Sequence, residues 1–156
     1  MKEFLLSIVR LVFGVRDEHF SLPAYRGRMD GMHEVSETYE IGVFLFGNLY
    51  QFSILPGFIF DGASIPRLLW FAAGDPMQPP RVAAALVHDW LYRTGILPKW
   101  QADLIYGVIQ AQAGRAYWRI LVEYLALVFG GGKAWRDNRA SGQQDEALTL
   151  GRITIK

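Results

Sequence analysis

The sequence contains no cysteine, little net charge and no long hydrophobic run. The 156 residues carry no Cys and a formal net charge of +1. The first absence excludes disulfides and thiolate zinc sites, and the near-neutral charge provides no field that would recruit nucleic acid. We therefore expect no nucleic-acid partner. Half of the residues are hydrophobic, enough to build the core of one ordinary domain.

The N-terminus MKEFLLSIVRLVFG is apolar but does not fit a targeting segment. Glu3 and Arg10 interrupt the apolar run, so it is neither a signal peptide nor long enough to span a bilayer. The polar positions repeat at helical spacing, which predicts an amphipathic helix over residues 1–13. This helix packs on its own domain or docks on a partner or membrane surface, and the sequence leaves both open.

The strand signals come early in the chain and the helix signals come late. Apolar residues alternate over 41–45 and 50–54, and the Gly47-Asn48 pair between them predicts a β-hairpin. Helices are predicted over 81–93, 99–113 and 117–129, the first ended by Gly95. We expect an α+β domain over residues 14–135, with a small antiparallel sheet packed against an antiparallel helical half. Residues 136–156 are predicted to be a polar tail or arm, with LTLGRITIK as either a final strand or part of the arm.

The stretch LVHDWLYRTG places a His-Asp pair inside an apolar helix. Helical spacing puts His88 and Tyr92 on one face, and a single acid, Asp103, lies at the matching level of the next helix. A carboxylate on one imidazole nitrogen fixes the tautomer and leaves the other nitrogen free as a base. Asp89 could hold a hard cation through oxygen. The alternative is a buried polar network that only ties two helices together.

A turn-rich stretch, FDGASIPR, supplies further candidates. Asp61 is a second candidate cation ligand, and Ser64 and Arg67 could converge with it, although a plain turn with a helix cap explains the same residues. His33 could be another ligand or simply a solvated loop residue. No P-loop, dinucleotide fingerprint or zinc-finger spacing is present.

Four blocks of the sequence resemble one phage and prophage family. They are ILPGFIFDGASIPRLLW, AAALVHDWLYRTG, QADLIY and the FGGGKAW region. In this order they are similar to the domain-of-unknown-function family thirteen-fifty-three, over roughly residues 55–135. The resemblance implies a phage or prophage origin and no particular activity.

The His-Asp-x-x-Tyr pattern also resembles the active-site helix of secreted phospholipase A-two enzymes. The resemblance implies that His88 activates water, that Asp89 binds calcium and that Asp103 orients the His. The Gly-rich calcium loop and the disulfides of those enzymes are absent, and the second Asp comes much sooner in the sequence. These departures favour chemical similarity over common descent.

Three functions follow as expectations. The first is a hydrolase acting on a lipid or cell-envelope ester, with catalytic His88, Asp103 and Tyr92 and with Asp89 and Asp61 around a divalent cation such as calcium. The second is a phage tail or neck component that contacts other phage structural proteins, in which the same cluster is a structural network. The third is a small protein that binds a host factor. The expected location is the virion or the host cytoplasm.

Overall fold

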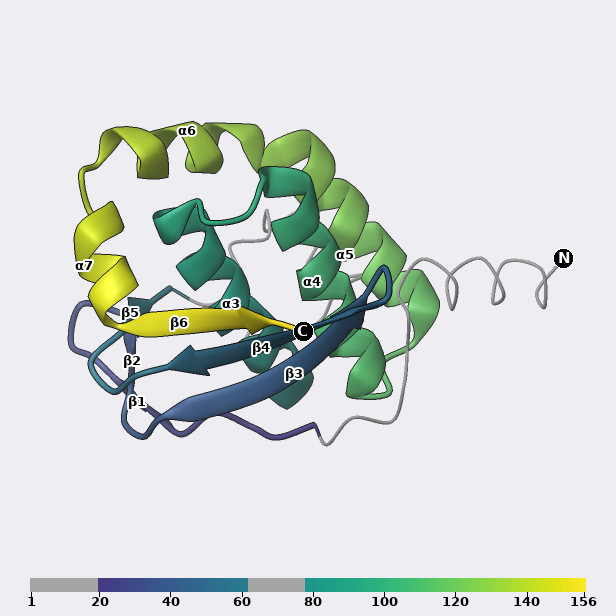
Figure 1. Ribbon diagram of the computed structural model, residues 1–156, viewed down its shortest axis with the longest axis horizontal. Coiled ribbons are helices and arrows are strands. Elements are labelled where there is room, and N and C mark those ends of the chain that lie inside the picture. Colours follow the sequence, from purple (N-terminus) through teal and green to yellow (C-terminus); the bar gives the residue numbers. More distant parts are fainter. Residues whose placement is uncertain (1–19, 62–77) are drawn as a thin grey trace, which may run out of the picture.

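The structure of the protein is a computed structural model that describes residues 20–61 and 78–156 (Figure 1). It is an α+β fold with two three-stranded antiparallel sheets, in the strand orders β1-β2-β5 and β3-β4-β6. The predicted fold class is therefore confirmed. The predicted helix over 1–13 and the candidates Ser64 and Arg67 lie outside the described residues.

The main sheet is built on the predicted hairpin. Strands β3 (Tyr39–Leu45) and β4 (Asn48–Ile54) pair in the register Val43↔Tyr50. The alternating residues of β3 that were predicted to face inward are buried. The turn lies one residue earlier than predicted: Phe46 and Gly47 both adopt positive φ, at 50° and 82°. A two-residue turn that matches the strand twist requires this conformation at both positions, so Phe46 takes a conformation unusual for a bulky residue.

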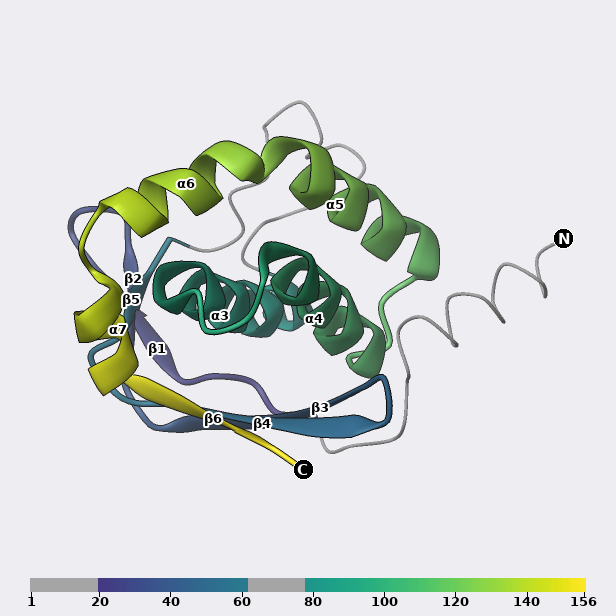
Figure 2. The same ribbon diagram turned by 45° about the horizontal axis from the view of Figure 1, so that its top comes forward.

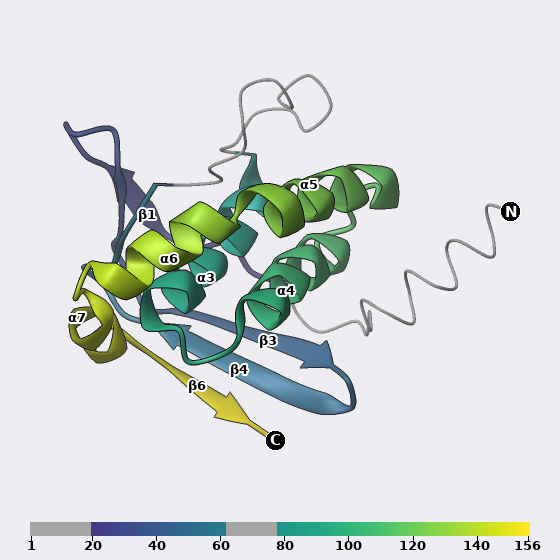
Figure 3. The same cartoon turned by 90° about the horizontal axis from the view of Figure 1, so that it is seen from above.

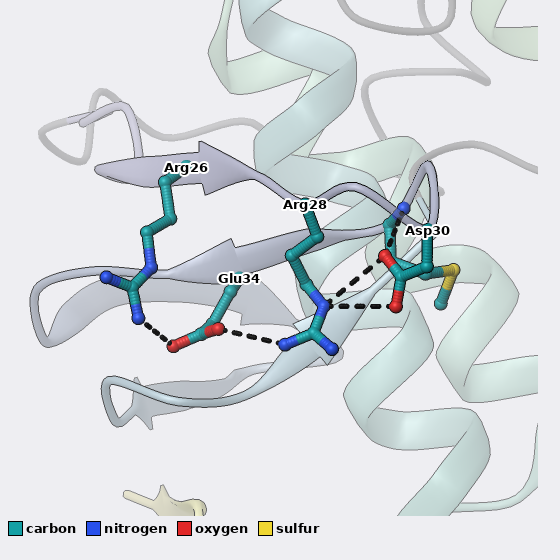
Figure 4. A network of polar contacts seen from close by, with 5 residues as sticks. Arg26, Arg28, Asp30 and Glu34 are labelled. Carbon is teal, nitrogen blue, oxygen red and sulfur yellow. Dashed lines mark hydrogen bonds and ion pairs between the residues drawn. The ribbon is translucent and has the colours of Figure 1, made fainter.

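The smaller sheet joins β1 (Tyr25–Gly27), β2 (His33–Val35) and β5 (Ile59–Phe60). Its outer face carries an ion-pair network in which Arg26 and Arg28 approach Glu34 from either side, at 2.7 and 3.1 Å (Figure 4). Arg28 also contacts Asp30 at 3.2 Å. Pairs this exposed to solvent add little stability, so we infer that the network mainly helps to fix the local shape of the β1–β2 hairpin.

Helices α3 (Pro79–Thr94) and α4 (Lys99–Gln112) form the centre of the helical half. Prolines are well tolerated in a first helical turn, so α3 begins two residues earlier than predicted. It ends at Gly95, which has the left-handed φ of 59° and donates its N–H to the Leu91 carbonyl. The short connection makes α4 an antiparallel neighbour, as predicted. Helix α3 is buried on nearly every side because it lies between the main sheet and the helices that follow it in the chain (Figure 2).

The elements form three layers (Figures 2 and 3). The β3-β4-β6 sheet is the first, α3 and α4 are the second, and α5 (Tyr117–Gly130) and α6 (Gly132–Ala140) cover the helical pair on the side away from the sheet. The core fills the space between the sheet and α3 and α4. This arrangement places the candidate site between the second and third layers.

Residues 136–156, predicted as a polar tail or arm, pack onto the domain. They include the end of α6, helix α7 (Gln144–Thr149) and strand β6 (Gly151–Ile155), which pairs antiparallel with β4. Trp90 of α3 donates its indole N–H to the Ala147 carbonyl at 2.9 Å. The final-strand alternative for LTLGRITIK is therefore the one that the structure adopts. Ala147 is the only fully buried residue of this segment, so the sequence carries few apolar positions that indicate how it packs.

Candidate functional site

The His88 and Asp103 side chains meet across the seam between α3 and α4. Their Nε2 and Oδ1 atoms lie 2.9 Å apart. His88 is 6% exposed and Asp103 is 1% exposed, so this contact is almost fully removed from water. The two residues are at the same level because they lie at similar distances from the tight turn that follows Gly95. The hydrogen bond predicted by counting along the antiparallel helices is present.

Asp103 accepts two further hydrogen bonds. The Tyr92 hydroxyl donates to Oδ1 at 2.8 Å, and the Lys99 ammonium contacts Oδ2 at 2.6 Å. Burial by itself would raise the pKa of Asp103, but the hydrogen bonds from His88 and Lys99 outweigh burial and the pKa is lowered. Asp103 is therefore an ionised carboxylate at neutral pH. Sequence reasoning missed Lys99, although its i,i+4 spacing to Asp103 on one helix could have indicated it.

The His88 ring is held between two tyrosines. It lies against Tyr92 with ring centroids 4.0 Å apart, and the Tyr106 ring meets it edge-on at 5.4 Å. Burial lowers the pKa of His88, despite the opposing effect of Asp103. The imidazole is therefore neutral at pH 7. Because Asp103 is an ionised acceptor, we assign the ring proton to Nε2, which leaves the lone pair on Nδ1.

Asp89 and Asp61 form a carboxylate pair beside the His88 cluster. The Asp61 backbone N–H donates to Asp89 Oδ2 at 3.2 Å. Burial, followed by the nearby Asp61 carboxylate, raises the pKa of Asp89 well above its ordinary value. A neighbouring carboxylate favours the protonated form of Asp89, and a cation bound between the two side chains would favour its ionised form. The structure thus brings together the two predicted cation ligands.

Calcium requires six to eight oxygen ligands, and this pair supplies part of such a set. Within residues 20–61 and 78–156 no group of three or more His, Asp or Glu side chains is placed to hold a metal. The donor type fits a hard cation, with Asp89 and Asp61 as the residues that would hold it. His33, the other suggested ligand, packs instead against the Tyr25 and Phe60 rings in the smaller sheet.

A second buried polar cluster lies on the other side of Tyr106, and sequence reasoning missed it. Glu123 of α5 accepts the Tyr106 hydroxyl at 2.8 Å and contacts Arg81 at 2.5 Å and Arg115 at 2.7 Å. Glu123 and Arg81 are fully buried. Glu123 is the single acid in a largely apolar helix, which is the signal that identified Asp103. Tyr106 therefore links the two clusters, through its ring to His88 and through its hydroxyl to Glu123.

The end of α5 closes over the Asp103 cluster. Lys99 donates a second hydrogen bond to the Leu127 carbonyl at 2.9 Å. Gly131, in the glycine run after α5, lies so close that a Cβ there would be 2.6 Å from both the Tyr92 hydroxyl oxygen and the Leu127 carbonyl oxygen. The glycine is needed at this position for close approach.

The described helices are too short or too polar for any of them to cross a membrane. Among known proteins, a family model described as Protein of unknown function (DUF1353) matches residues 46–127, which is just over half of the chain. The matched region contains the His88 cluster, the Asp61–Asp89 pair and the Glu123 cluster. No curated protein and no solved structure matches the chain.

Proposed function

The chain belongs to the DUF1353 family, and we propose that it is a hydrolase in which His88 is the general base. The observation that carries the proposal is the 2.9 Å contact between His88 and a carboxylate that is itself held ionised by Lys99 and Tyr92. A general base must be neutral at the working pH, fixed in one tautomer and supported as it becomes charged. His88 meets the first requirement through burial and the other two through Asp103.

The proposed reaction is hydrolysis of an ester. Nδ1 of His88 removes a proton from water while the water oxygen bonds to the ester carbonyl carbon. The tetrahedral intermediate then collapses, the bond to the leaving alkoxide breaks, and the imidazolium returns its proton to that oxygen. Asp103 stabilises the imidazolium throughout, and Tyr92 positions Asp103 through its hydroxyl. Both roles have the geometry described above.

The Asp61–Asp89 pair is close enough to His88 for the Asp61 carboxylate to affect the His88 pKa, which supports a role in charge stabilisation. A divalent cation held there would polarise the carbonyl oxygen of the substrate, and calcium is the proposed ion because both donors are carboxylates. The substrate class that we propose is an ester of lipid or cell envelope. A phage or prophage role is part of this proposal, since such an enzyme would act when a phage crosses or disrupts the envelope.

The test uses p-nitrophenyl esters of increasing acyl length as probes, with the full chain, in calcium or in EDTA. His88→Gln and Asp103→Asn are expected to lower kcat/KM by at least about a hundredfold, the range for loss of a general base. His33→Gln is the matched control and should retain activity. For the wild type, kcat/KM should rise with pH through the pKa of His88 and be level at neutral pH. Wild-type turnover no faster than that of His88→Gln, on every probe, would refute the proposal.

A second candidate is a phage tail or neck component in which the cluster is a structural network. The favouring observation is that polar contacts among α3, α4 and α5 are nearly all buried, which also suits a helix-joining role. Mass spectrometry of purified phage particles separates the two candidates. A tail or neck component is present in the particles in stoichiometric amount. An enzyme that acts only inside the infected host cell is absent from them. His88→Gln would then reduce stability without any activity to lose.

A further inference from the structure

The outer face of α5 is an apolar stripe that no described element covers. Five large apolar side chains are exposed on it, at the i, i+3, i+4 and i+7 spacings that share one helix face. Phe129 is the most exposed of them, at 85%. The members of this α5 stripe are Trp118, Leu121, Leu125, Val128 and Phe129.

Helix α5 lies in the third layer, on the side of α3 and α4 away from the sheet (Figures 2 and 3). The stripe extends from Trp118 to Phe129, so it is about 17 Å long at the helical rise per residue. The inner face of α5 is fixed by Glu123, Ile120 and the Lys99 bond to Leu127. These contacts prevent α5 from rotating about its axis, so the apolar side chains of its outer face stay exposed.

Basic residues flank both ends of the stripe. Arg119 lies over the Trp118 ring at 5.1 Å, and the Arg136 guanidinium lies beside Gly132, immediately after the helix. Lys133 is exposed at the same end. From 115 to 139 the sequence has only two acids, Glu123, which is buried under two arginines, and Asp137, which pairs with Lys133. Because Asp137 neutralises Lys133, the net positive charge around the apolar centre comes from Arg119 at one end and Arg136 at the other.

We propose that the α5 stripe binds the surface of an anionic lipid bilayer. An apolar helix face with aromatic residues and flanking Arg and Lys is the pattern of helices that lie in the interfacial plane, where apolar area and attraction to anionic headgroups add. The positive flanks distinguish this partner from a neutral apolar one. The binding stands apart from hydrolysis, so it can hold if the proposed activity does not. If both hold, α5 carries the inner contacts of the site on one face and the lipid contact on the other.

The test measures cosedimentation of the full-length protein with vesicles of phosphatidylcholine mixed with phosphatidylglycerol, and with vesicles of phosphatidylcholine alone. Binding is expected to the mixed vesicles and to weaken with added salt. Leu125→Glu should lower the partition coefficient at least about tenfold, because a carboxylate replaces buried apolar area. Arg119→Gln should lower it about fivefold on the mixed vesicles only, the effect of one basic residue near an anionic surface.

The matched control is Leu148→Glu on α7, because Leu148 and Leu125 are 40% and 43% exposed. It should leave vesicle binding unchanged, and circular dichroism should show all variants folded. Absence of wild-type binding overturns the proposal, as does equal loss in the two Glu variants. If Ile8→Glu abolishes binding and Leu125→Glu does not, the N-terminal segment is the contact and the proposal is wrong. It is also wrong if the wild type self-associates, does not bind vesicles and becomes monomeric in Leu125→Glu.

Discussion

Replacing Asp103 by Asn tests whether the carboxylate holds the helical half together. The substitution keeps the shape of the side chain but removes the charge that His88, Tyr92 and Lys99 share. Hydrogen bonds to a charged group contribute ~1.5–3 kcal/mol each, against ~0.5–1.5 kcal/mol for neutral ones. Two bonds become neutral, and the third is lost because the Asn amide N–H₂ faces the Lys99 ammonium. Lys99 is partly exposed and can turn toward water, so we expect a loss of about 3 kcal/mol in the free energy of unfolding.

The measurement is urea unfolding at pH 7, followed by circular dichroism. For a domain of this size 3 kcal/mol corresponds to a fall in Tm of roughly 6–12 °C, with an unchanged urea m-value. Asp137→Asn is the matched control, since Asp137 also pairs with a lysine four residues earlier but on the surface, and it should change stability little. The reasoning is refuted if the two variants are equally stable.

The pH dependence of the free energy of unfolding, measured for wild type and Asp103→Asn, gives an independent check. The pKa of Asp103 is lower in the folded protein than its ordinary value. Its stabilising contribution is therefore complete above about pH 4, near the pKa of an unfolded Asp, and is lost as the pH falls through the folded value. The stability difference between wild type and Asp103→Asn should shrink below about pH 4. A constant difference down to strongly acidic pH would contradict the ionised state assigned to Asp103.

Four other substitutions have expected outcomes. His88 has a lowered pKa, so wild-type stability should fall as the pH drops below about 6.5, the unfolded value, and urea titrations of His88→Gln should lack that part of the slope. Asp89 has a raised pKa, so ionising it costs stability as the pH rises above about 4. Asp89→Asn should therefore have a higher Tm than wild type at pH 8 and a similar Tm at pH 4. If added calcium raises the Tm of wild type but not that of Asp89→Asn, Asp89 is a calcium ligand. Gly131→Ala should cost about 1–3 kcal/mol by overpacking, because its Cβ would lie 2.6 Å from the Tyr92 hydroxyl. Thermal melts should show almost no change for Gly132→Ala, whose Cβ meets only a flexible arginine at 3.4 Å.

The His88–Asp103 contact was predictable because it depends on local rules. A short turn makes neighbouring helices antiparallel, and equal distances from that turn put two residues at one level. The same reasoning did not reach Glu123, since its partners Arg81 and Tyr106 come from two other helices. The sequence spacing of these three residues does not indicate that α5 packs on α3 and α4 where Glu123 meets Arg81 and Tyr106.

The packing of the C-terminal segment, residues 136–156, could not be predicted from sequence patterns. Residues 136–147 are mostly polar, and the apolar residues of LTLGRITIK indicated a possible strand without indicating its partner. The segment's position depends on backbone pairing of β6 with β4 and on hydrogen bonds to α3. Trp90 donates its indole N–H to the Ala147 carbonyl, and the Arg139 and Gln144 side chains donate to carbonyls at the end of α3. Backbone groups are the same in every residue, so such pairing leaves little trace in the sequence.

The sequence by itself determined the α+β class, the hairpin, the three main helices and the pairing of His88 with Asp103, because periodicity, turn residues and short connections act over neighbouring residues. Tertiary structure alone decided which way α5 faces. That orientation buries Glu123 against two arginines, brings Gly131 against Tyr92 and leaves the α5 stripe exposed. The physical reason is that α5 is apolar on most of its circumference, so its own sequence favours no single buried face, and the buried charge of Glu123 selects one.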